Sequence, residues 1–200
     1  MSSCVPLDVI RAVMASFLTA LSDEGRRGRS LLVSTTNCPW RISAAMLSRF
    51  LVIPVLHPLA EDFPEIVIAT AERVHPLVQL DATDERILAA ATLFYDKGAS
   101  AREIRRALGH AHLLRRALDP DAVLFAARDY CASTSRTSSV YADLWAVQCC
   151  SQNSLFPWHA DSQRYPFPPH LAGAIDVTTG DKVESELRKR IEELRPYANV

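Results

Sequence analysis

Residues 31–50, LLVSTTNCPWRISAAMLSRF, decide the fold expected for the first part of this chain. The stretch begins with three apolar residues and turns polar at Thr35 and Thr36, as a strand buried in a parallel sheet does. Asn37 lies just past the carboxyl end of this run. Active-site residues of open α/β sheets occupy such strand ends. The pattern therefore predicts a strand over residues 31–36 that delivers Asn37 to a site.

The residues on either side extend this α/β pattern. Apolar residues at helical spacing predict an amphipathic helix over residues 8–21, ahead of the strand. Residues 42–50 have helical character, and residues 51–53 predict a second short strand that ends at Pro54. We therefore expect residues 1–57 to form a small unit that contains both helices and strands.

From residue 58 onward the sequence favours helices alone. Local start signals are strong: Ser100 and Glu103 have the spacing of a capping box, and Asp119-Pro120 supplies an N-cap followed by proline at the first helical position. We expect helices over 63–74, from 85 to near 97, over 101–108, over 120–130, over 141–148 and over 183–194. Residues 58–132 are predicted to form a helical unit, and residues 133–200 an irregular segment, rich in proline and aromatic residues, with a carboxyl-terminal helix.

Composition and residue pattern exclude several kinds of binding partner. The 200 residues carry a formal net charge of −1, so nucleic acid is not the expected partner. No run of eighteen apolar residues is present and the amino terminus lacks a secretory pattern, so we expect a cytoplasmic protein without membrane contact. No cysteine and histidine spacing is typical of a metal site, and we expect none.

The stretch quoted above resembles the sensor-1 to arginine-finger segment of AAA+ ATPases, most closely those of the katanin and spastin kind. That segment reads Thr-Asn-x-Pro-Trp, then an apolar residue, then Ala, then Arg-Phe. The matching positions are Thr36, Asn37, Pro39, Trp40, Ile42, Ala45, Arg49 and Phe50. The resemblance covers roughly residues 8–109 and implies the last part of a nucleotide-binding core followed by a helical lid.

The resemblance also implies catalytic roles for two side chains. Asn37 would position the attacking water, because a neutral amide can hold water without acting as a competing base. Arg49 would act on the ATP of a neighbouring subunit as an arginine finger, whose planar fork matches spread phosphate charge. Two positions depart from the family, since many relatives have an acidic residue at Ser43 and a second arginine at Ser48. Outside this context, Asn37 is a turn residue and Arg49 a surface arginine that pairs with a carboxylate.

A second resemblance lies at Gly98-Ala99-Ser100-Ala101-Arg102-Glu103-Ile104, which is similar to the segment that starts a lid helix beside the nucleotide. It implies that Gly98, Ser100 and Arg102 contact nucleotide, as does Thr36 in the first segment. The motif is weak by itself, because any capped helix can share it and Arg102 can equally be a solvated side chain.

The phosphate-binding loop of such ATPases is absent, since none of the six glycines lies in a Gly-Lys-Ser/Thr pattern. ATP and magnesium would be bound mainly by residues outside this chain. The chain is then a fragment of a longer ATPase or a remnant that docks on intact ATPase subunits, and we expect it to associate with a partner. The alternatives are a non-catalytic helical module that regulates an AAA ATPase, and an unrelated helical binding protein.

Overall fold

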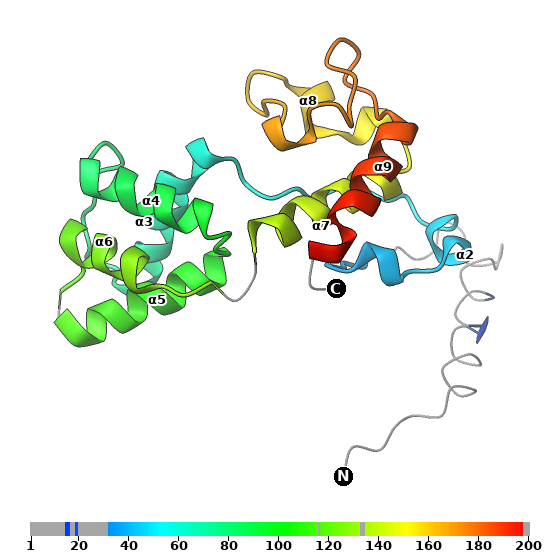
Figure 1. Cartoon of the computed structure of the whole chain (residues 1–200). Helices are drawn as coiled ribbons and strands as arrows, with labels where there is room; N and C mark the ends of the chain where they lie inside the picture. Colours follow the sequence, from blue (N-terminus) through cyan, green and yellow to red (C-terminus); the bar gives the residue numbers. More distant parts are fainter. Residues whose placement is uncertain (1–14, 17–18, 20–31, 116, 133–134, 198–200) are drawn as a thin grey trace.

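The computed structural model describes residues 15–16, 19, 32–115, 117–132 and 135–197. Regular structure in these residues is almost entirely helical, as expected for a mainly α chain (Figure 1). The described β-structure consists of two isolated bridges, Ala172 with Ile175 and Ile175 with Lys182. Most of the helix expected over 8–21 lies outside the described residues. None of the described helices combines the length and the apolar character that a bilayer crossing requires.

Four helices form the first unit, at the left of Figure 1: α3 (Phe63–Val74), α4 (Glu85–Asp96), α5 (Ala101–Arg115) and α6 (Pro120–Asp129), preceded by the 3-10 turn η3 (Ala60–Asp62). The predicted start signals are confirmed. The Asp119 carboxylate accepts a hydrogen bond from the Ala122 amide at 2.8 Å, and the Glu103 carboxylate accepts from the Ser100 amide at 2.9 Å. These local contacts satisfy amide groups that have no partner inside the helix.

The core of this four-helix unit is apolar and built at helical spacing. Helix α3 packs on α4 and α5, and α6 packs on α4 and α5. The largest side chains that this core buries completely are Val67, Ile87, Phe94, Ile104, Leu108 and Val123. Burying a large apolar side chain contributes about 1.5–3 kcal/mol, so these faces account for the packing of helices that would be marginal in isolation.

The second unit joins the carboxyl-terminal residues to an amino-terminal segment. It contains η2 (Pro39–Arg41), α2 (Ala44–Leu47), α7 (Arg136–Cys149), η4 (Asn153–Leu155), α8 (Pro157–Ala160), η5 (Pro169–Leu171), α9 (Glu184–Leu194) and η6 (Arg195–Tyr197). Helices α7 and α9 pack together. The buried core includes Leu144, Phe156 and Leu187, and Trp40 and Leu56 pack against it from the amino-terminal segment. We call this assembly of residues 38–49 and 135–197 the mixed unit, and residues 50–57 lie against it.

The prediction of strands over residues 31–36 and 51–53 is wrong for the part that is described, because residues 32–36 and 51–53 lie in no strand. A strand needs a neighbour that pairs its amides and carbonyls. Residue 52 instead pairs with the side chain and amide of Ser151, and Val33 and Leu51 are 76% and 61% exposed. The α/β character expected for residues 1–57 is therefore absent from their described part.

Three predicted helices have different lengths from those expected, and one of them is α7, which begins at Arg136 and not near residue 141. The helix over 42–50 is reduced to the single turn α2, with the Ser43 hydroxyl accepting a hydrogen bond from the Met46 amide. Helix α5 was expected to end at Leu108, yet it continues through Gly109 to Arg115. Glycine disfavours a helix interior by about 1 kcal/mol relative to alanine, which burial of Leu108 and Ala111 on either side outweighs.

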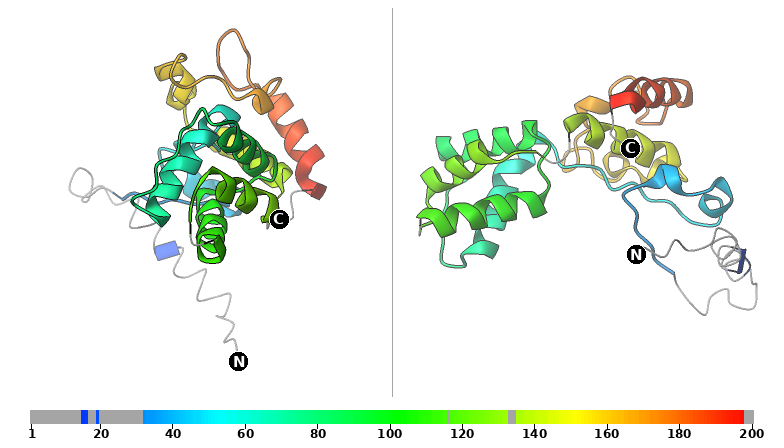
Figure 2. Two further views of the ribbon diagram at one scale, coloured as in Figure 1. Left: turned by 90° about the vertical axis from the view of Figure 1, so that its left-hand side faces the viewer. Right: turned by 60° about the horizontal axis from the view of Figure 1, so that its bottom comes forward.

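The two units meet where α4 ends and α7 begins, and Figure 2 shows them from two further directions. Gly98 ends α4 with φ +68°, a conformation that favours glycine, and the Ala99 amide donates to the Phe94 carbonyl. The Arg136 guanidinium lies 3.7 Å from the centroid of the Tyr95 ring and donates a hydrogen bond to its hydroxyl. This contact joins the first turn of α7 to the last turn of α4.

Candidate functional site

The segment expected to carry the catalytic groups forms a tight turn followed by two short helical turns. The Thr36 hydroxyl accepts a hydrogen bond from the Cys38 amide at 3.0 Å, and the Asn37 side-chain oxygen accepts one from the Cys38 thiol at 3.4 Å. Both Thr36 and Asn37 are exposed. Asn37 is thus a turn residue whose amide group faces solvent, at the position where the sequence placed a strand end.

Arg49 lies just after α2 and is exposed. Its guanidinium donates a hydrogen bond to the Ala45 carbonyl, which belongs to the same short helix. The side chain is therefore folded back along α2, close to the backbone that carries it.

The candidate nucleotide-binding residues of the lid motif lie in the four-helix unit. Gly98 supplies the cap of α4, and the Ser100 hydroxyl donates a 2.7 Å hydrogen bond to the Glu103 carboxylate at the start of α5. Arg102 is exposed in the first turn of α5. Gly98 and Ser100 thus have structural roles that account for the motif without a ligand.

The predicted residues do not converge on one site within the described part of the chain. Thr36, Asn37 and Arg49 belong to one segment, whereas Gly98, Ser100 and Arg102 belong to the other unit, and no described hydrogen bond or ion pair connects the two sets. A hollow of about 470 Å³ lies between α5 and α6, but Arg102 is not among the residues that line it. The hollow is lined by both acidic and basic groups, including Glu103, Arg106, His110 and Asp129.

A cluster of titratable side chains lies elsewhere, around a buried carboxylate. Asp143 in α7 is 2% exposed at its side chain and binds two histidines. One carboxylate oxygen accepts hydrogen bonds from the His57 ring at 2.7 Å and from the His57 backbone amide at 3.1 Å. The other accepts from the His170 ring at 2.8 Å. We call His57, Asp143 and His170 the carboxylate cluster.

The pKa of Asp143 reflects two opposing effects. Burial raises the pKa, because removal from water disfavours the charged form. The hydrogen bonds from His170 and then His57 lower it, and their combined effect is larger, so the pKa lies below its ordinary value of 3.8. The carboxylate is therefore ionised at neutral pH in a position where an unpaired charge would be strongly disfavoured.

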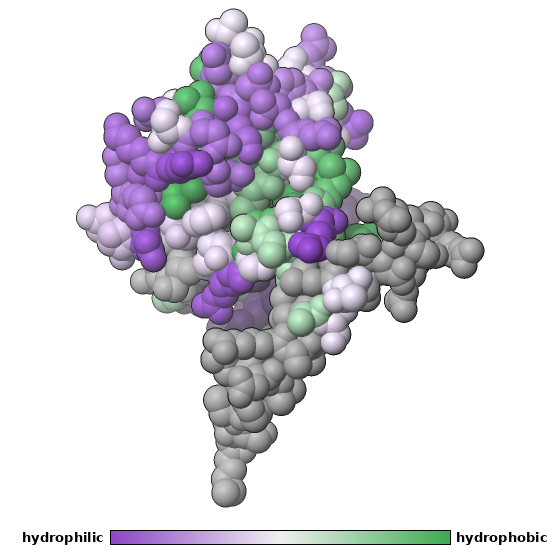
Figure 3. All heavy atoms as spheres, turned by 90° about the vertical axis from the view of Figure 1, so that its right-hand side faces the viewer, coloured by the Kyte–Doolittle hydropathy of each residue, from purple (hydrophilic) through white to green (hydrophobic). Residues whose placement is uncertain are grey.

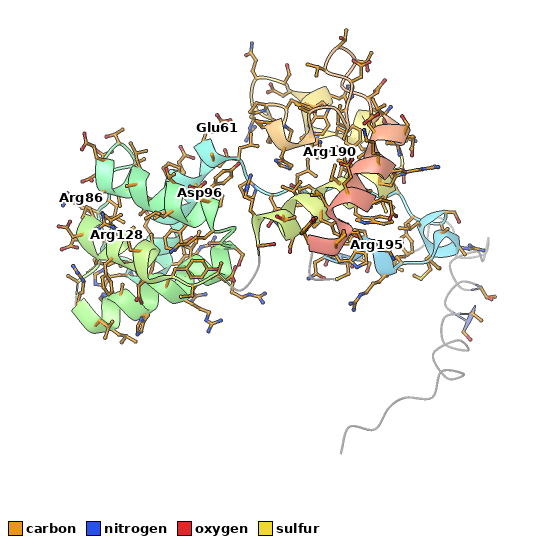
Figure 4. All side chains as sticks on the ribbon, in the orientation of Figure 1. Glu61, Arg86, Asp96, Arg128, Arg190 and Arg195 are labelled. Atoms are coloured by element: carbon orange, nitrogen blue, oxygen red, sulfur yellow. The ribbon has the colours of Figure 1, made fainter. Side chains whose placement is uncertain are left out.

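The three residues of the cluster are positioned by different parts of the chain. His57 follows α2 in the amino-terminal segment, and His170 lies in η5. Arg190, labelled on α9 in Figure 4, donates hydrogen bonds to the backbone carbonyls of His170 and Ala172 at 2.7 and 2.8 Å. Helices α7 and α9 thus hold the loop around residue 170 against the carboxylate from two sides.

The chemistry available to the cluster is hydrogen bonding and charge pairing. The described residues contain no group of three or more His, Cys, Asp or Glu side chains arranged to hold a metal ion. The His57 side chain is 46% exposed while its Nδ1 faces Asp143, and the His170 ring is only 13% exposed. The cluster therefore fixes the ring orientation of both histidines and ties two separate segments to the carboxylate on α7.

One signal in the sequence could have indicated the cluster. Asp143 lies on the apolar stripe of α7 that includes Val140, Leu144 and Val147, so a charged residue occupies a core-facing position. Its partners leave no such signal, because His57 and His170 lie 86 and 27 residues away along the chain. Neither histidine is among the candidate site residues that the sequence indicates.

Comparison with known proteins gives no relative: no family model, curated protein or solved structure matches this chain.

Proposed function

We propose that this chain is a carboxyl-terminal part of an AAA-family ATPase and acts by completing an ATPase assembly. In this proposal the segment with Asn37 and Arg49 meets the nucleotide site of a neighbouring subunit, and the four-helix unit serves as the lid. ATP and magnesium are bound mainly by the partner, since the 200 residues contain no Gly-Lys-Ser/Thr loop.

The observation that carries the proposal is an apolar face left uncovered beside Arg49. Residues 50–57, which we call the extended segment, run without helix between the two units (cyan in Figure 1). Leu51, Ile53 and Val55 are 61%, 59% and 87% exposed, and we call them the outer face. The intervening residues face the mixed unit: Val52 and Leu56 are half-buried and Pro54 is buried. This period of two is that of a strand with one face against a core.

Exposed apolar side chains in a row indicate a contact surface. Branched residues at alternate positions are typical of strands that pair within a sheet, and the segment forms no described pairing with another strand. A sheet in an intact ATPase subunit is a partner that would cover the outer face and bring Arg49 next to another chain. Figure 3 shows the side of the molecule that carries α2 and α9, where hydrophobic surface lies among hydrophilic regions.

The two catalytic candidates have the exposure to solvent that their proposed roles require. Asn37 and Arg49 both lie at the surface, where a neighbouring subunit can reach them. Phosphoryl transfer depends on positioning and on stabilising charge, and an arginine supplied by a second chain does the latter. Arg49 would have to leave the Ala45 carbonyl to reach a phosphate, where it would form stronger charge-assisted hydrogen bonds.

The proposal is tested by association with an intact AAA-family ATPase from the same source, measured by sedimentation velocity. We expect the wild-type chain to bind and Ile53→Asp to weaken binding by roughly tenfold or more, because a charge would enter an apolar contact. Val177→Asp is the matched control, since Val177 is 78% exposed in the loop between η5 and α9 and does not belong to the extended segment. Equal binding by the two variants, or no binding by the wild-type chain, would contradict the proposal.

The non-catalytic alternative predicts a different outcome of a turnover measurement. A regulatory module would associate through the same outer face, yet Arg49→Ala would leave the ATPase rate of the mixture unchanged.

A further inference from the structure

The extended segment is attached to the mixed unit at two polar points, one near each end. At the first, the Val52 amide donates to the Ser151 hydroxyl at 2.8 Å, and the Ser151 amide donates to the Val52 carbonyl at 3.2 Å. At the second, the backbone amide and the ring of His57 both donate to Asp143. The residues joined at the first point are 99 positions apart along the chain, and those joined at the second point are 86 apart.

Apolar burial between the two points is small. Of the inward side chains, Pro54 is buried, and Val52 and Leu56 are half-buried. The outer face is exposed. A segment held by so little buried area depends on its hydrogen bonds to keep one conformation. The attachment at Asp143 is the stronger of the two, because its acceptor is a buried carboxylate and hydrogen bonds to charged groups are worth about twice those between neutral groups.

Asp143 also connects the segment to the rest of the mixed unit. Its second oxygen binds His170, whose backbone carbonyl is held by Arg190 on α9. One carboxylate therefore bridges the extended segment, α7, and the loop fixed by α9. Removing the His57 ring leaves Asp143 with His170 and the residue-57 amide, so the connection to the segment can be weakened while the connection to the loop remains.

We propose that the carboxylate cluster is a conformational latch that holds the extended segment on the mixed unit, so that its outer face projects to solvent in one orientation. With His57 bound to Asp143, the segment is fixed and the outer face is presented. With that contact broken, residues 50–57 leave the surface while the cores of both units stay folded. The latch controls whether the outer face is presented to a partner, and this consequence rests on the proposed function. The latch itself does not require an ATPase.

The latch is tested by hydrogen exchange of the full chain at neutral pH, followed by mass spectrometry of peptides that cover residues 50–57. In His57→Ala we expect exchange in these peptides to accelerate by roughly tenfold, because the opening of the segment then breaks only the contact of the residue-57 amide to the carboxylate and no longer that of the ring. Exchange in α7 and α9 should stay as in the wild type. His159→Ala is the matched control, since His159 belongs to the same unit and contacts the Gly180 carbonyl at 3.1 Å instead.

Asp143→Asn provides the second variant and removes the charge but not the side-chain volume. We expect the same acceleration over residues 50–57, accompanied by some acceleration around residue 170. Unchanged exchange over residues 50–57 in His57→Ala would overturn the latch, even if Asp143→Asn unfolds the whole unit. The two proposals fail separately: association with the ATPase tests the outer face, and exchange of the chain alone tests the latch.

Discussion

The four-helix unit and the mixed unit are stabilised in different ways. In the first, four helices joined by short connections bury aliphatic and aromatic side chains spaced at helical intervals. In the second, segments from the two ends of the chain share one core, and the buried carboxylate of Asp143 fastens them together. Contacts between residues close in sequence build the four-helix unit, and the sequence indicates its helices. Closing a long loop in the mixed unit requires specific polar contacts, which the sequence does not indicate.

The largest expected effect is a loss of stability in the four-helix unit that exceeds the loss in the mixed unit. Phe94 is completely buried in the four-helix unit, and Phe94→Ala should destabilise that unit by about 3–5 kcal/mol through the cavity it leaves. All three tryptophans, Trp40, Trp145 and Trp158, lie at the core of the mixed unit, so tryptophan fluorescence reports on that unit. We expect the urea midpoint by far-ultraviolet circular dichroism to fall more than the midpoint by fluorescence.

A cavity variant in the mixed unit provides the reverse test of whether the two units unfold separately. Phe156 is completely buried beside Trp158, and Phe156→Ala should lower the fluorescence midpoint more than the dichroism midpoint. If each variant moves both midpoints equally, the two units unfold as one and the comparison fails.

The next effect concerns the polar fastening of the mixed unit. Asp143→Asn should destabilise that unit by about 1–3 kcal/mol, because the amide cannot accept from both histidines with the same strength and leaves buried donors poorly paired. Fluorescence-monitored urea unfolding measures the change. Asp121→Asn, at a carboxylate that is 62% exposed on α6, is the control and should leave the fluorescence midpoint unchanged.

Acid should remove the contribution of Asp143. Because the folded-state pKa of Asp143 lies below 3.8, the unfolded chain binds the proton more readily, and stability falls as pH falls. The contribution is complete above the unfolded pKa and is lost as pH drops through the folded pKa. The stability difference between wild type and Asp143→Asn should therefore shrink as the pH falls from above 3.8 through the lower folded-state pKa of Asp143. A difference that stays constant or grows on acidification would contradict the paired carboxylate.

The smallest effects compare two glycines, one before α5 and one inside it. Gly98 has φ +68°, and an added Cβ would lie 3.2 Å from the Arg136 amide nitrogen, so Gly98→Ala should destabilise by about 1–2 kcal/mol. Gly109 lies inside α5 with no atom within 4 Å of an added Cβ, so Gly109→Ala should stabilise by about 0.5–1 kcal/mol. Thermal unfolding of the two variants gives the signs. Stabilisation by Gly98→Ala would mean that the junction between the units is not fixed as described.

Local signals explain how much of the fold the sequence predicted. Helices α4 and α6 begin next to acidic N-cap residues, Asp84 and Asp119, and each cap lies within a few positions of the first buried apolar residue of its helix. The strands were wrong because an apolar run shows a preference only, and a strand also needs a neighbour, which residues 32–36 and 51–53 do not have among the described residues.

The carboxylate cluster was beyond sequence reasoning for a related reason. The position of Asp143 on the apolar stripe of α7 indicates a buried charge, but nothing near it in sequence names His57 or His170 as partners. The proposed roles of Asn37 and Arg49 rest on a resemblance, and both residues are exposed in the structure.

ATP turnover by an intact AAA-family ATPase from the same source, measured with and without excess chain, tests the central proposal most directly. We predict that the wild-type chain changes the turnover, that Arg49→Ala reduces this change by roughly tenfold or more, and that Arg41→Ala, at another exposed arginine of the same segment, leaves it intact. The chain alone should show no turnover. An equal effect of the wild-type chain and Arg49→Ala, or hydrolysis by the chain alone, would contradict the assignment of Arg49 as a group that acts on a neighbour's nucleotide.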